Sequence, residues 1–506
     1  MPRTDRFLKT GRYPHEVRSA LTRLVPTLVA AFLLVTTGAS AAAPQPIVEG
    51  DSIIDSVTGK VFVPHGVNFP GYEYACQQGY SYGEDGTEAG EMASTVAAMA
   101  GWKINTVRLP LNQDCWLGDD GLPAGGLTMN GYRNSVESFV NMLGTFGIVT
   151  ILDLHWSGPN GVVANGLRPM PDDRSPAFWS SVAGRFKDNR SVIFDLFNEP
   201  HSRWNVDDVK VFGLSWDCWA NGGCIAPSEP DTEPYSGLLP GFRTVGLKNL
   251  LAVVRAAGAT QPVLLSGTDY ANDLRGWLNS APKDDQLIAG FHNYLVQRCR
   301  TVRCWNEEIE PLSRKVPVLT AEIGQNDCGN PDHLNRYMDW ADERRIGYLV
   351  WAWWDLPKLG CTNFALVSDL DGTPLAPVGT AFRDHLASLP ETLPEPPRPV
   401  NPGISFRSAW WNGRVLGIEV RINPQVSAKL RVSVRLARDR SFKPPALSTS
   451  RKLSRELPVV SGVVSARLRI PRGLKPVLVT AGYPGDRLFK PGSVKRKPGS
   501  VRKLTR

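Results

Sequence analysis

Between residues 60 and 356 the chain alternates short, continuous apolar runs with longer stretches in which apolar residues recur at helical spacing. Short apolar runs predict buried parallel strands, and amphipathic stretches between them predict the crossover helices that parallel strands require. The runs are 61–68, 104–109, 149–155, 192–198, 263–266, 287–294, 316–322 and 348–354. The helical stretches include 135–143, 177–186 and 245–256.

Eight strand–helix repeats in about 330 residues suit a closed (β/α)8 barrel. An open, doubly wound sheet is the alternative, but no glycine-rich phosphate loop follows the first run. We therefore expect an α/β protein whose main domain is a TIM barrel over residues 44–388.

The pattern changes beyond residue 388. Six prolines between residues 389 and 402 predict a stiff linker. Residues 431–436 and 466–470 then alternate apolar and basic side chains with period two, as in strands with one face in a core. We expect a small all-β sandwich domain over residues 403–489 and a basic, disordered tail over residues 490–506.

Charge is divided unevenly between these parts. The 506 residues carry a formal charge of +8, but residues 401–506 hold 24 Lys and Arg against four acids, whereas residues 44–400 sum to −16. So basic a region predicts binding to an anionic cell-surface polymer or lipid, and no nucleic acid is expected for an exported chain. Alternatively, the arginines only solvate a sandwich whose Trp410 and Trp411 contact sugars or fill its core.

Residues 1–43 predict a signal peptide for secretion. Six basic residues precede the largely apolar run 24–35, and residues 39–41, Ala-Ser-Ala, offer a cleavage site. The run is shorter than the roughly 20 apolar residues of a membrane-spanning helix. An uncleaved membrane anchor is the alternative.

Eight cysteines fit the oxidising compartment that export implies. Their connectivity is open, because eight cysteines allow about 105 pairings. No Cys-x-x-Cys pair occurs, so a zinc site is disfavoured and no metal is expected. The preferred pairs are Cys76 with Cys115, Cys218 with Cys224, Cys299 with Cys304, and Cys328 with Cys361.

The carboxyl ends of barrel strands form the active-site face of a TIM barrel, and here they are polar. Glu199 follows the fourth run and Glu322 ends the seventh, on opposite sides of the mouth. Paired carboxylates suit glycoside hydrolysis, although each could also be a structural acid in an ion pair. Asp153 and Asp195 lie within their strands and are expected in the barrel interior.

Other chemistries lack their motifs. The chain has no Gly-x-Ser-x-Gly elbow for a serine hydrolase and no His-Glu-x-x-His pair for a zinc hydrolase. No cofactor is implied.

Several of these elements together resemble glycoside hydrolase family 5, the cellulase family, over about residues 60–385. They are Phe197-Asn198-Glu199-Pro200, Glu322, Arg108 before Leu109-Pro110, His155 before Trp156, and His292-x-Tyr294. The resemblance implies that Glu199 is the general acid/base and Glu322 the nucleophile of a retaining mechanism. It further implies that Asn198 binds the sugar 2-hydroxyl, Arg108 and Tyr294 hold Glu322, His155 and His292 line the cleavage subsite, and Trp351 stacks on a sugar.

Together with the predicted signal peptide, the resemblance implies a secreted endo-β-1,4-glucanase acting on a polysaccharide or oligosaccharide, and we expect a monomer. A β-mannanase, an exo-β-glucosidase and a non-catalytic carbohydrate-binding protein are the alternatives. A retaining mechanism predicts carboxyl groups about 5–5.5 Å apart, and we expect the charge of Glu322 to raise the pKa of Glu199.

The surroundings of the cleft are less defined. An insertion over residues 204–239 follows Glu199 and is expected to shape the cleft. Tryptophans in predicted loops are candidates either for sugar subsites or for packing. They are Trp116, Trp156, Trp204, Trp216, Trp219 and Trp305.

Overall fold

A computed structural model describes residues 42–500 apart from 85–86, 88–90, 232, 326–329, 355–363, 395–402, 413, 423–428, 439–451, 459–462, 472–473 and 484–491. The expected signal peptide apart from residues 42 and 43, most of the expected linker, and the pair Cys328–Cys361 lie outside the described residues. In the part of the chain that is described, no helix is both long and apolar enough to cross a membrane.

Eight parallel strands close into a barrel in the order β11-β12-β13-β14-β3-β4-β5-β6, which confirms the expected TIM barrel. Two predicted runs, 263–266 and 287–294, coincide with strands. The last run, 348–354, overlaps its strand by three residues, and each of the other runs overlaps its strand by four or more. The strands are β3 (His65–Asn68), β4 (Thr106–Asn112), β5 (Val149–Trp156), β6 (Val192–Asp195), β11 (Val263–Ser266), β12 (Leu287–Tyr294), β13 (Val318–Gly324) and β14 (Gly347–Val350).

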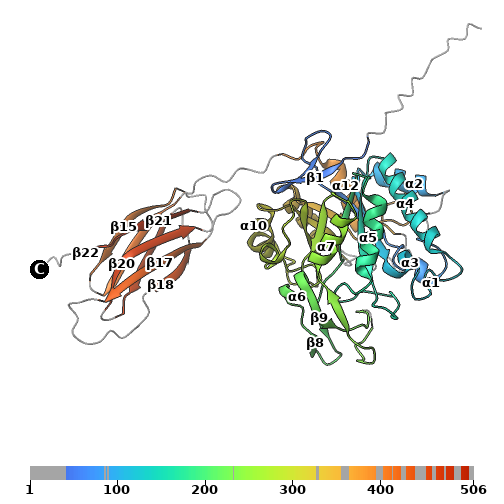
Figure 1. The fold of residues 1–506 in the computed structure, drawn as a ribbon. Helices are drawn as coiled ribbons and strands as arrows, with labels where there is room; N and C mark the ends of the chain where they lie inside the picture. The colour runs from blue at the N-terminus through green and yellow to red at the C-terminus, as the bar shows by residue number, and fades with distance from the viewer. Residues whose placement is uncertain are drawn as a thin grey trace, which may run out of the picture. The chain divides into compact units, whose positions relative to one another are not determined.

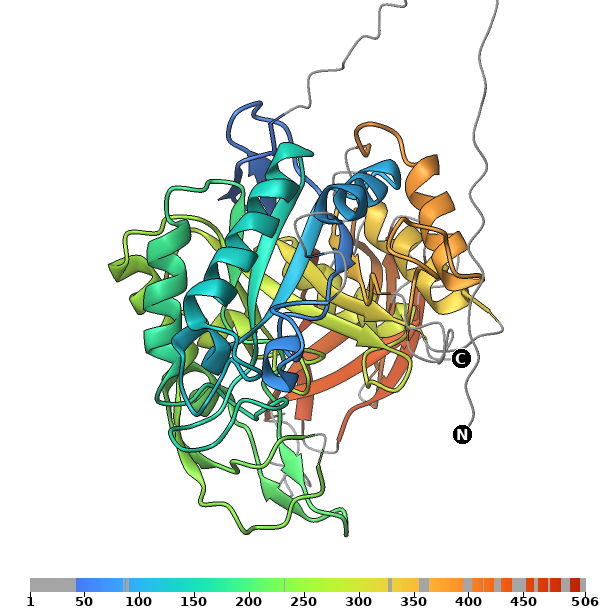
Figure 2. The ribbon, with the colours of Figure 1, turned by 90° about the vertical axis from the view of Figure 1, so that its right-hand side faces the viewer.

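Helices surround these strands, and α5 packs against α7 on the outside of the barrel (Figure 1). Figure 2 shows the helices of the first half of the barrel standing outside its strands. The longer helices are α2 (Met92–Gly101), α4 (Met129–Thr145), α5 (Ser175–Phe186), α7 (Leu247–Ala256), α11 (Asp332–Asp342) and α12 (Val378–Ser388). The short ones are α1 (Ala75–Gln78), α3 (Gln113–Leu117), α6 (Trp216–Asn221), α8 (Trp277–Ser280), α9 (Val302–Cys304), η1 (Trp305–Ile309) and α10 (Glu310–Ser313).

The barrel interior changes from apolar to charged along its axis. Near the amino ends of the strands, a fully buried layer includes Ile151 and Ile193. Two residues further along the same strands, on the same face, come Asp153 and Asp195. The apolar layer, at about 1.5–3 kcal/mol for each large side chain, stabilises the barrel that holds these acids in place.

Small elements complete this part of the chain. A hairpin of β1 (Pro46–Glu49) and β2 (Ser52–Asp55) packs Ile53 against the apolar layer of the barrel. The insertion after β6 forms two antiparallel pairs, β7 (Arg203–Trp204) with β8 (Lys210–Phe212) and β9 (Gly222–Ala226) with β10 (Phe242–Val245). Three expected disulfides are present: Cys76–Cys115, Cys218–Cys224 and Cys299–Cys304.

The C-terminal strands form two four-stranded sheets, ordered β19-β16-β15-β22 and β18-β17-β20-β21 (Figure 1). Apolar side chains that alternate along the strands share one core, which fits the expected sandwich. The strands are β15 (Ser405–Trp411), β16 (Val415–Arg421), β17 (Lys429–Arg438), β18 (Lys452–Pro458), β19 (Val463–Arg469), β20 (Leu474–Tyr483), β21 (Gly492–Arg496) and β22 (Gly499–Ser500).

One expectation about this region was wrong. Residues 490–506 were expected to be a disordered tail, but residues 492–496 and 499–500 form β21 and β22. β21 pairs with β20 and β22 pairs with β15. Each uses the free backbone groups of a strand at the edge of a sheet, a driving force that composition does not reveal.

Candidate active site

The two candidate glutamates lie together at the mouth of the barrel. Glu322 belongs to β13, and Glu199 lies in the loop four residues after the end of β6. A carboxylate oxygen of each and a ring nitrogen of His292 all lie within 4.8 Å of one another. The parallel strands therefore bring these acids, 123 positions apart, into one site.

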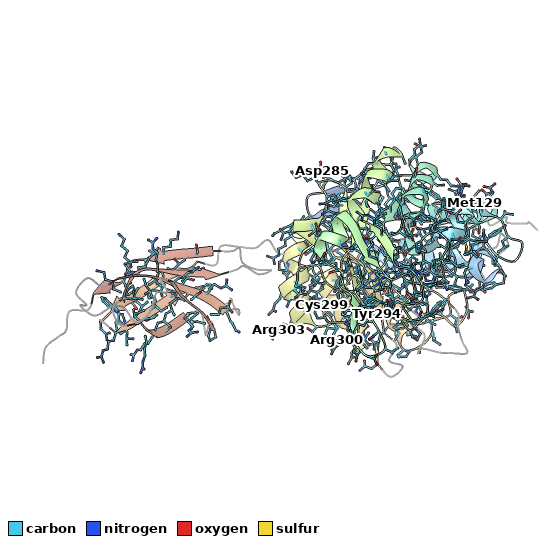
Figure 3. All side chains as sticks on the ribbon, turned by 60° about the horizontal axis from the view of Figure 1, so that its bottom comes forward. Met129, Asp285, Tyr294, Cys299, Arg300 and Arg303 are labelled. Atoms are coloured by element: carbon cyan, nitrogen blue, oxygen red, sulfur yellow. A yellow bond between two sulfur atoms is a disulfide. The ribbon has the colours of Figure 1, made fainter. Side chains whose placement is uncertain are left out.

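Both oxygens of Glu322 accept hydrogen bonds from charged or phenolic donors. Arg108 donates from Nη1 to Oε1 at 2.8 Å, and Tyr294 donates from its hydroxyl to Oε2 at 2.7 Å. Burial, together with the charges of Glu322 and Glu199, raises the pKa of Tyr294, so the phenol keeps the proton it donates. Figure 3 labels Tyr294 beside residues of the loop that follows β12. These donors hold the carboxylate in a fixed orientation.

Arg108 is completely buried beneath Glu322 and is itself tightly held. Its guanidinium lies 3.0 Å from Asp153 Oδ2 and 2.9 Å from Asp195 Oδ2, and Nη2 donates to Asn198 Oδ1 at 2.7 Å. Burial lowers the pKa of Arg108, but the surrounding carboxylates outweigh that effect and the pKa is raised. The arginine therefore stays charged and links Asn198 to the barrel interior.

Part of this support was not predicted from the sequence. Asp153 and Asp195 lie in the barrel interior as expected, but their contacts with Arg108 were not expected. Asn68, at the end of β3, accepts from Arg108 at 3.0 Å and donates to the carbonyl of Ala321, the residue before Glu322. The polar end of the first run was the available signal for Asn68.

Two buried imidazoles complete the mouth. His292 Nδ1 lies 2.8 Å from Glu199 Oε1 and 3.5 Å from Glu322 Oε2. His155 Nδ1 lies 2.6 Å from Asp153 Oδ2. Burial lowers the pKa of both histidines to about 3, so neither ring carries a charge at neutral pH. His292 therefore bridges the two glutamates as a neutral hydrogen-bonding group.

Glu199 has a different environment from Glu322. Burial raises the pKa of Glu199 to about 8, with Arg108 opposing and the charges of Asp231 and Asp153 adding to the increase. The expected direction is confirmed, but the expected cause was wrong. Burial of the carboxyl group, rather than the charge of Glu322, is the largest cause of the shift.

A second cluster, which the sequence analysis missed, lies behind Glu199. His201 Nδ1 is 2.7 Å from the Glu199 carbonyl oxygen, and its ring stacks on Tyr270 at 4.4 Å with 6° between the planes. Tyr270 donates to Asp231 of the insertion at 3.0 Å, and Arg203 also donates to Asp231. The insertion thus reaches the candidate site through two aromatic rings.

The backbone that presents Tyr270 is unusual. Asp269, Tyr270 and Ala271 have φ of 57°, 56° and 57°, a region that residues other than glycine rarely adopt in succession. Gln297 donates to the carbonyl of Tyr270, and the backbone N–H of His292 donates to that of Ala271. Long-range contacts therefore hold this turn.

Comparison with known proteins identifies the fold and the family. A family model for cellulase, glycosyl hydrolase family 5, matches residues 62–356. The chain belongs to this family. It is an O-glycosyl hydrolase, as the strand-end motifs predicted.

Relatives of this glycosyl hydrolase are distant. The manganese-dependent endoglucanase Eg5A of Phanerodontia chrysosporium is 23% identical over 316 residues, which cover 57% of this chain and 71% of that protein. Endoglucanase B of Acetivibrio thermocellus is 29% identical over 188 residues, 34% of this chain and only 32% of that protein. The β-glucanase SdGluc5_26A of Saccharophagus degradans shares the fold, with a TM-score of 0.50 at 19% identity over 69% of this chain and 94% of that one.

Tryptophans of the cellulase domain divide between the mouth and the core. Trp351 is half-exposed and stacks against His155 at 5.5 Å with 15° between the planes, whereas Trp353 is completely buried. Trp156 is half-exposed near Tyr74. Trp204 is partly exposed in β7, and Trp216 is half-buried beside Trp219. Packing accounts for the fully buried Trp116, Trp219 and Trp305.

Two groups among the described residues bring three metal-ligating side chains together. Cys299 and Cys304, near Glu308, are joined in a disulfide and offer no thiolate. The other group is Glu199, His292 and Glu322, whose candidate ligand atoms already engage one another or Arg108 and Tyr294. The donor set is therefore arranged for hydrogen bonding within the protein.

Proposed function

We propose that this family 5 hydrolase is a retaining endo-β-1,4-glucanase, with Glu322 as the nucleophile and Glu199 as the acid/base. One observation carries the proposal: two carboxylates lie within 4.8 Å of each other in opposite environments. Glu322 accepts from a guanidinium and a phenol, which favours its charged form. Burial favours the protonated form of Glu199. This close spacing supports retention, because inverting enzymes separate the pair by about 6.5–9.5 Å.

In the first step an oxygen of Glu322 attacks the anomeric carbon while Glu199 gives its proton to the departing glycosidic oxygen. The glycosidic C–O bond breaks, a glycosyl ester to Glu322 forms, and the released chain leaves with a new hydroxyl. Asn198, held by Arg108, is positioned to bind the sugar 2-hydroxyl. The half-exposed ring of Trp351 offers an aromatic face to a pyranose ring.

In the second step Glu199, now ionised, takes a proton from water, whose oxygen attacks the same carbon. The ester bond breaks, Glu322 recovers its electron pair, and the product keeps the β-configuration. His292, which is neutral and lies within 2.8 Å of Glu199, orients that carboxyl in both steps.

Action on β-1,4-glucan within the chain is supported by the two relatives that are named endoglucanases. We further propose that the enzyme is exported, because residues 1–43 fit a signal peptide and three disulfides join cysteines of the barrel.

The test is product release from soluble β-1,4-glucan, mixed-linkage glucan, mannan and aryl β-glucosides, with the anomeric configuration of the first product read by NMR. We expect mixed oligosaccharides from the glucans and an initial β-product. Hydrolysis of mannan alone, or of aryl glucosides alone, would replace the substrate assignment with a mannanase or an exo-glucosidase. An initial α-product would contradict Glu322 as nucleophile.

A further inference from the structure

On the outer face of the sheet β19-β16-β15-β22, the indole ring of a tryptophan lies between glycines of the two neighbouring strands. The register pairs Trp410 of β15 with Gly417 of β16 on one side and with Gly499 of β22 on the other. A β-carbon at position 417 would collide with the Trp410 ring, so the ring lies across the glycine backbone. Neither neighbour has a side chain to cover it, so the half-buried ring lies on the outer face of the sheet as a platform.

Trp411 has the opposite orientation. It packs against the sandwich core together with Ala409, and its indole nitrogen is buried. Successive residues of a strand point to opposite faces, so Trp410 lies on the outer face and Trp411 on the inner one. Core packing explains Trp411 and leaves Trp410 without a structural explanation.

Several arginines lie on the same face as the Trp410 platform. Arg467 of β19 is the next residue in the same row, paired with Gly417, and Arg469 pairs with Val415 in the neighbouring row. Both arginines are exposed, and neither has an ion-pair partner among the described residues. Arg421 of β16 is exposed on the same face, where Arg407 instead pairs with Glu419 at 2.9 Å. An aromatic platform therefore lies beside unpaired positive charge.

We propose that this face binds an acidic polysaccharide, with a pyranose ring stacked on Trp410 and acidic groups of the polymer paired with Arg467 and Arg469. The apolar face of a sugar ring matches a flat indole. The forked donors of arginine match carboxylate and phosphate oxygens. The site is separate from the proposed catalytic residues and uses none of them.

Charge favours an acidic polymer over a neutral glucan. Residues 401–506 carry 24 basic side chains and four acids, so an acidic chain is attracted to the whole sandwich before it reaches the platform. A neutral glucan would stack on Trp410 without using that charge. The acidic assignment therefore predicts binding that weakens steeply with salt.

The experiment measures binding of the full chain to polygalacturonate and to neutral mixed-linkage glucan by affinity electrophoresis, at low and high salt. A Glu322→Gln background keeps the glucan intact. We expect polygalacturonate to retard the protein at low salt only. Trp410→Ala should weaken that binding about tenfold or more, equivalent to about 1.4 kcal/mol.

Matched variants separate the site from general charge. Arg467→Ser should weaken binding more than Arg435→Ser, which removes an exposed arginine from the other sheet. Trp204→Ala removes a partly exposed tryptophan of the barrel insertion and should change nothing. Gly417→Ala keeps the Trp410 side chain but displaces the ring, so it should weaken binding in a protein whose core is intact.

Three results would overturn the proposal: unchanged binding in Trp410→Ala and Gly417→Ala, equal losses in Arg467→Ser and Arg435→Ser, or binding of the neutral glucan that matches polygalacturonate at every salt concentration. Thermal unfolding of each variant identifies losses caused by a damaged sandwich. In the Glu322 wild-type background the four variants of the sandwich, Trp410→Ala, Gly417→Ala, Arg467→Ser and Arg435→Ser, should hydrolyse soluble glucan normally, which separates this site from the proposed catalytic function.

Discussion

Clusters of carboxylates and imidazoles lie at both ends of the barrel, one at the mouth and one at the amino ends of the strands, which we call the floor. The two clusters shift the pKa of their acids in opposite directions. At the floor, Asp342 lies 3.0 Å from His65 Nε2 and 2.7 Å from His385 Nε2 and also accepts from the Tyr348 hydroxyl. Burial alone would raise the pKa of Asp342, but these hydrogen bonds outweigh it and the pKa is lowered.

At the mouth the balance is reversed. The side chain of Glu199 is 12% exposed and has His292 Nδ1 as its single side-chain hydrogen-bond partner among the described residues, and burial raises its pKa to about 8. Burial by itself therefore does not decide whether a carboxyl group is ionised. The number of donors around the carboxylate does, because donors cancel the cost of burying a charge.

The largest expected effect comes from removing the proposed nucleophile. Glu322→Gln keeps the shape of the side chain but cannot form the glycosyl ester, so kcat/KM on β-glucan should fall on the order of 10⁴-fold or more. Glu310→Gln is the control, because Glu310 is equally buried but pairs with Arg314 and Arg344 away from the mouth. Similar losses of activity in two folded variants would remove the distinction between the mouth and the rest of the barrel.

The acid/base comes next. Glu199→Gln should lower the rate on glucans by about 10²–10⁴-fold and lower it less on aryl glucosides whose phenols leave without a proton. The wild-type rate should fall as the pH rises through about 8, because Glu199 then loses the proton it must donate. This alkaline limb should be absent from Glu199→Gln, as initial rates across a pH series would show. An unchanged limb would mean that another group provides the proton.

At the floor we expect a loss of stability rather than of activity. Asp342→Asn removes the charge that the two imidazoles and the phenol stabilise, which should lower the free energy of unfolding by about 1.5–3 kcal/mol at pH 7. Because the pKa of Asp342 is lowered, its contribution is present above its ordinary value of 3.8 and lost as the pH falls through the folded value.

Urea unfolding of Asp342→Asn against wild type at neutral and acid pH measures this. The difference between the two proteins should shrink in acid. Asp339→Asn, in the same helix but 76% exposed, is the control and should have little effect. A drop in kcat for folded Asp342→Asn would contradict a purely structural floor.

The sequence predicted the residues at the mouth of the barrel better than the buried contacts that hold them. Apolar runs located the strands. Because parallel strands end at one face, the sequence alone placed Glu199 and Glu322 at the same end of the barrel. The contacts of Asp153 and Asp195 with Arg108 need the barrel's cross-section, which no periodicity contains. The left-handed turn at Asp269 has neither glycine nor asparagine in its three positive-φ positions to mark it.

The smallest expected effect concerns the contribution of the insertion to the pKa of Glu199. Asp231 lies behind Glu199, and its charge adds to the raised pKa of Glu199, but burial is the larger cause. Asp231→Asn should therefore move the alkaline limb of the pH–rate profile slightly toward lower pH and leave the rate on the plateau unchanged. Asp217→Asn removes the same charge from an exposed position of the insertion and should leave the limb in place. A limb that moves equally in both variants would assign the effect to net charge, and one that moves in neither would mean that Asp231 does not contribute to the raised pKa of Glu199.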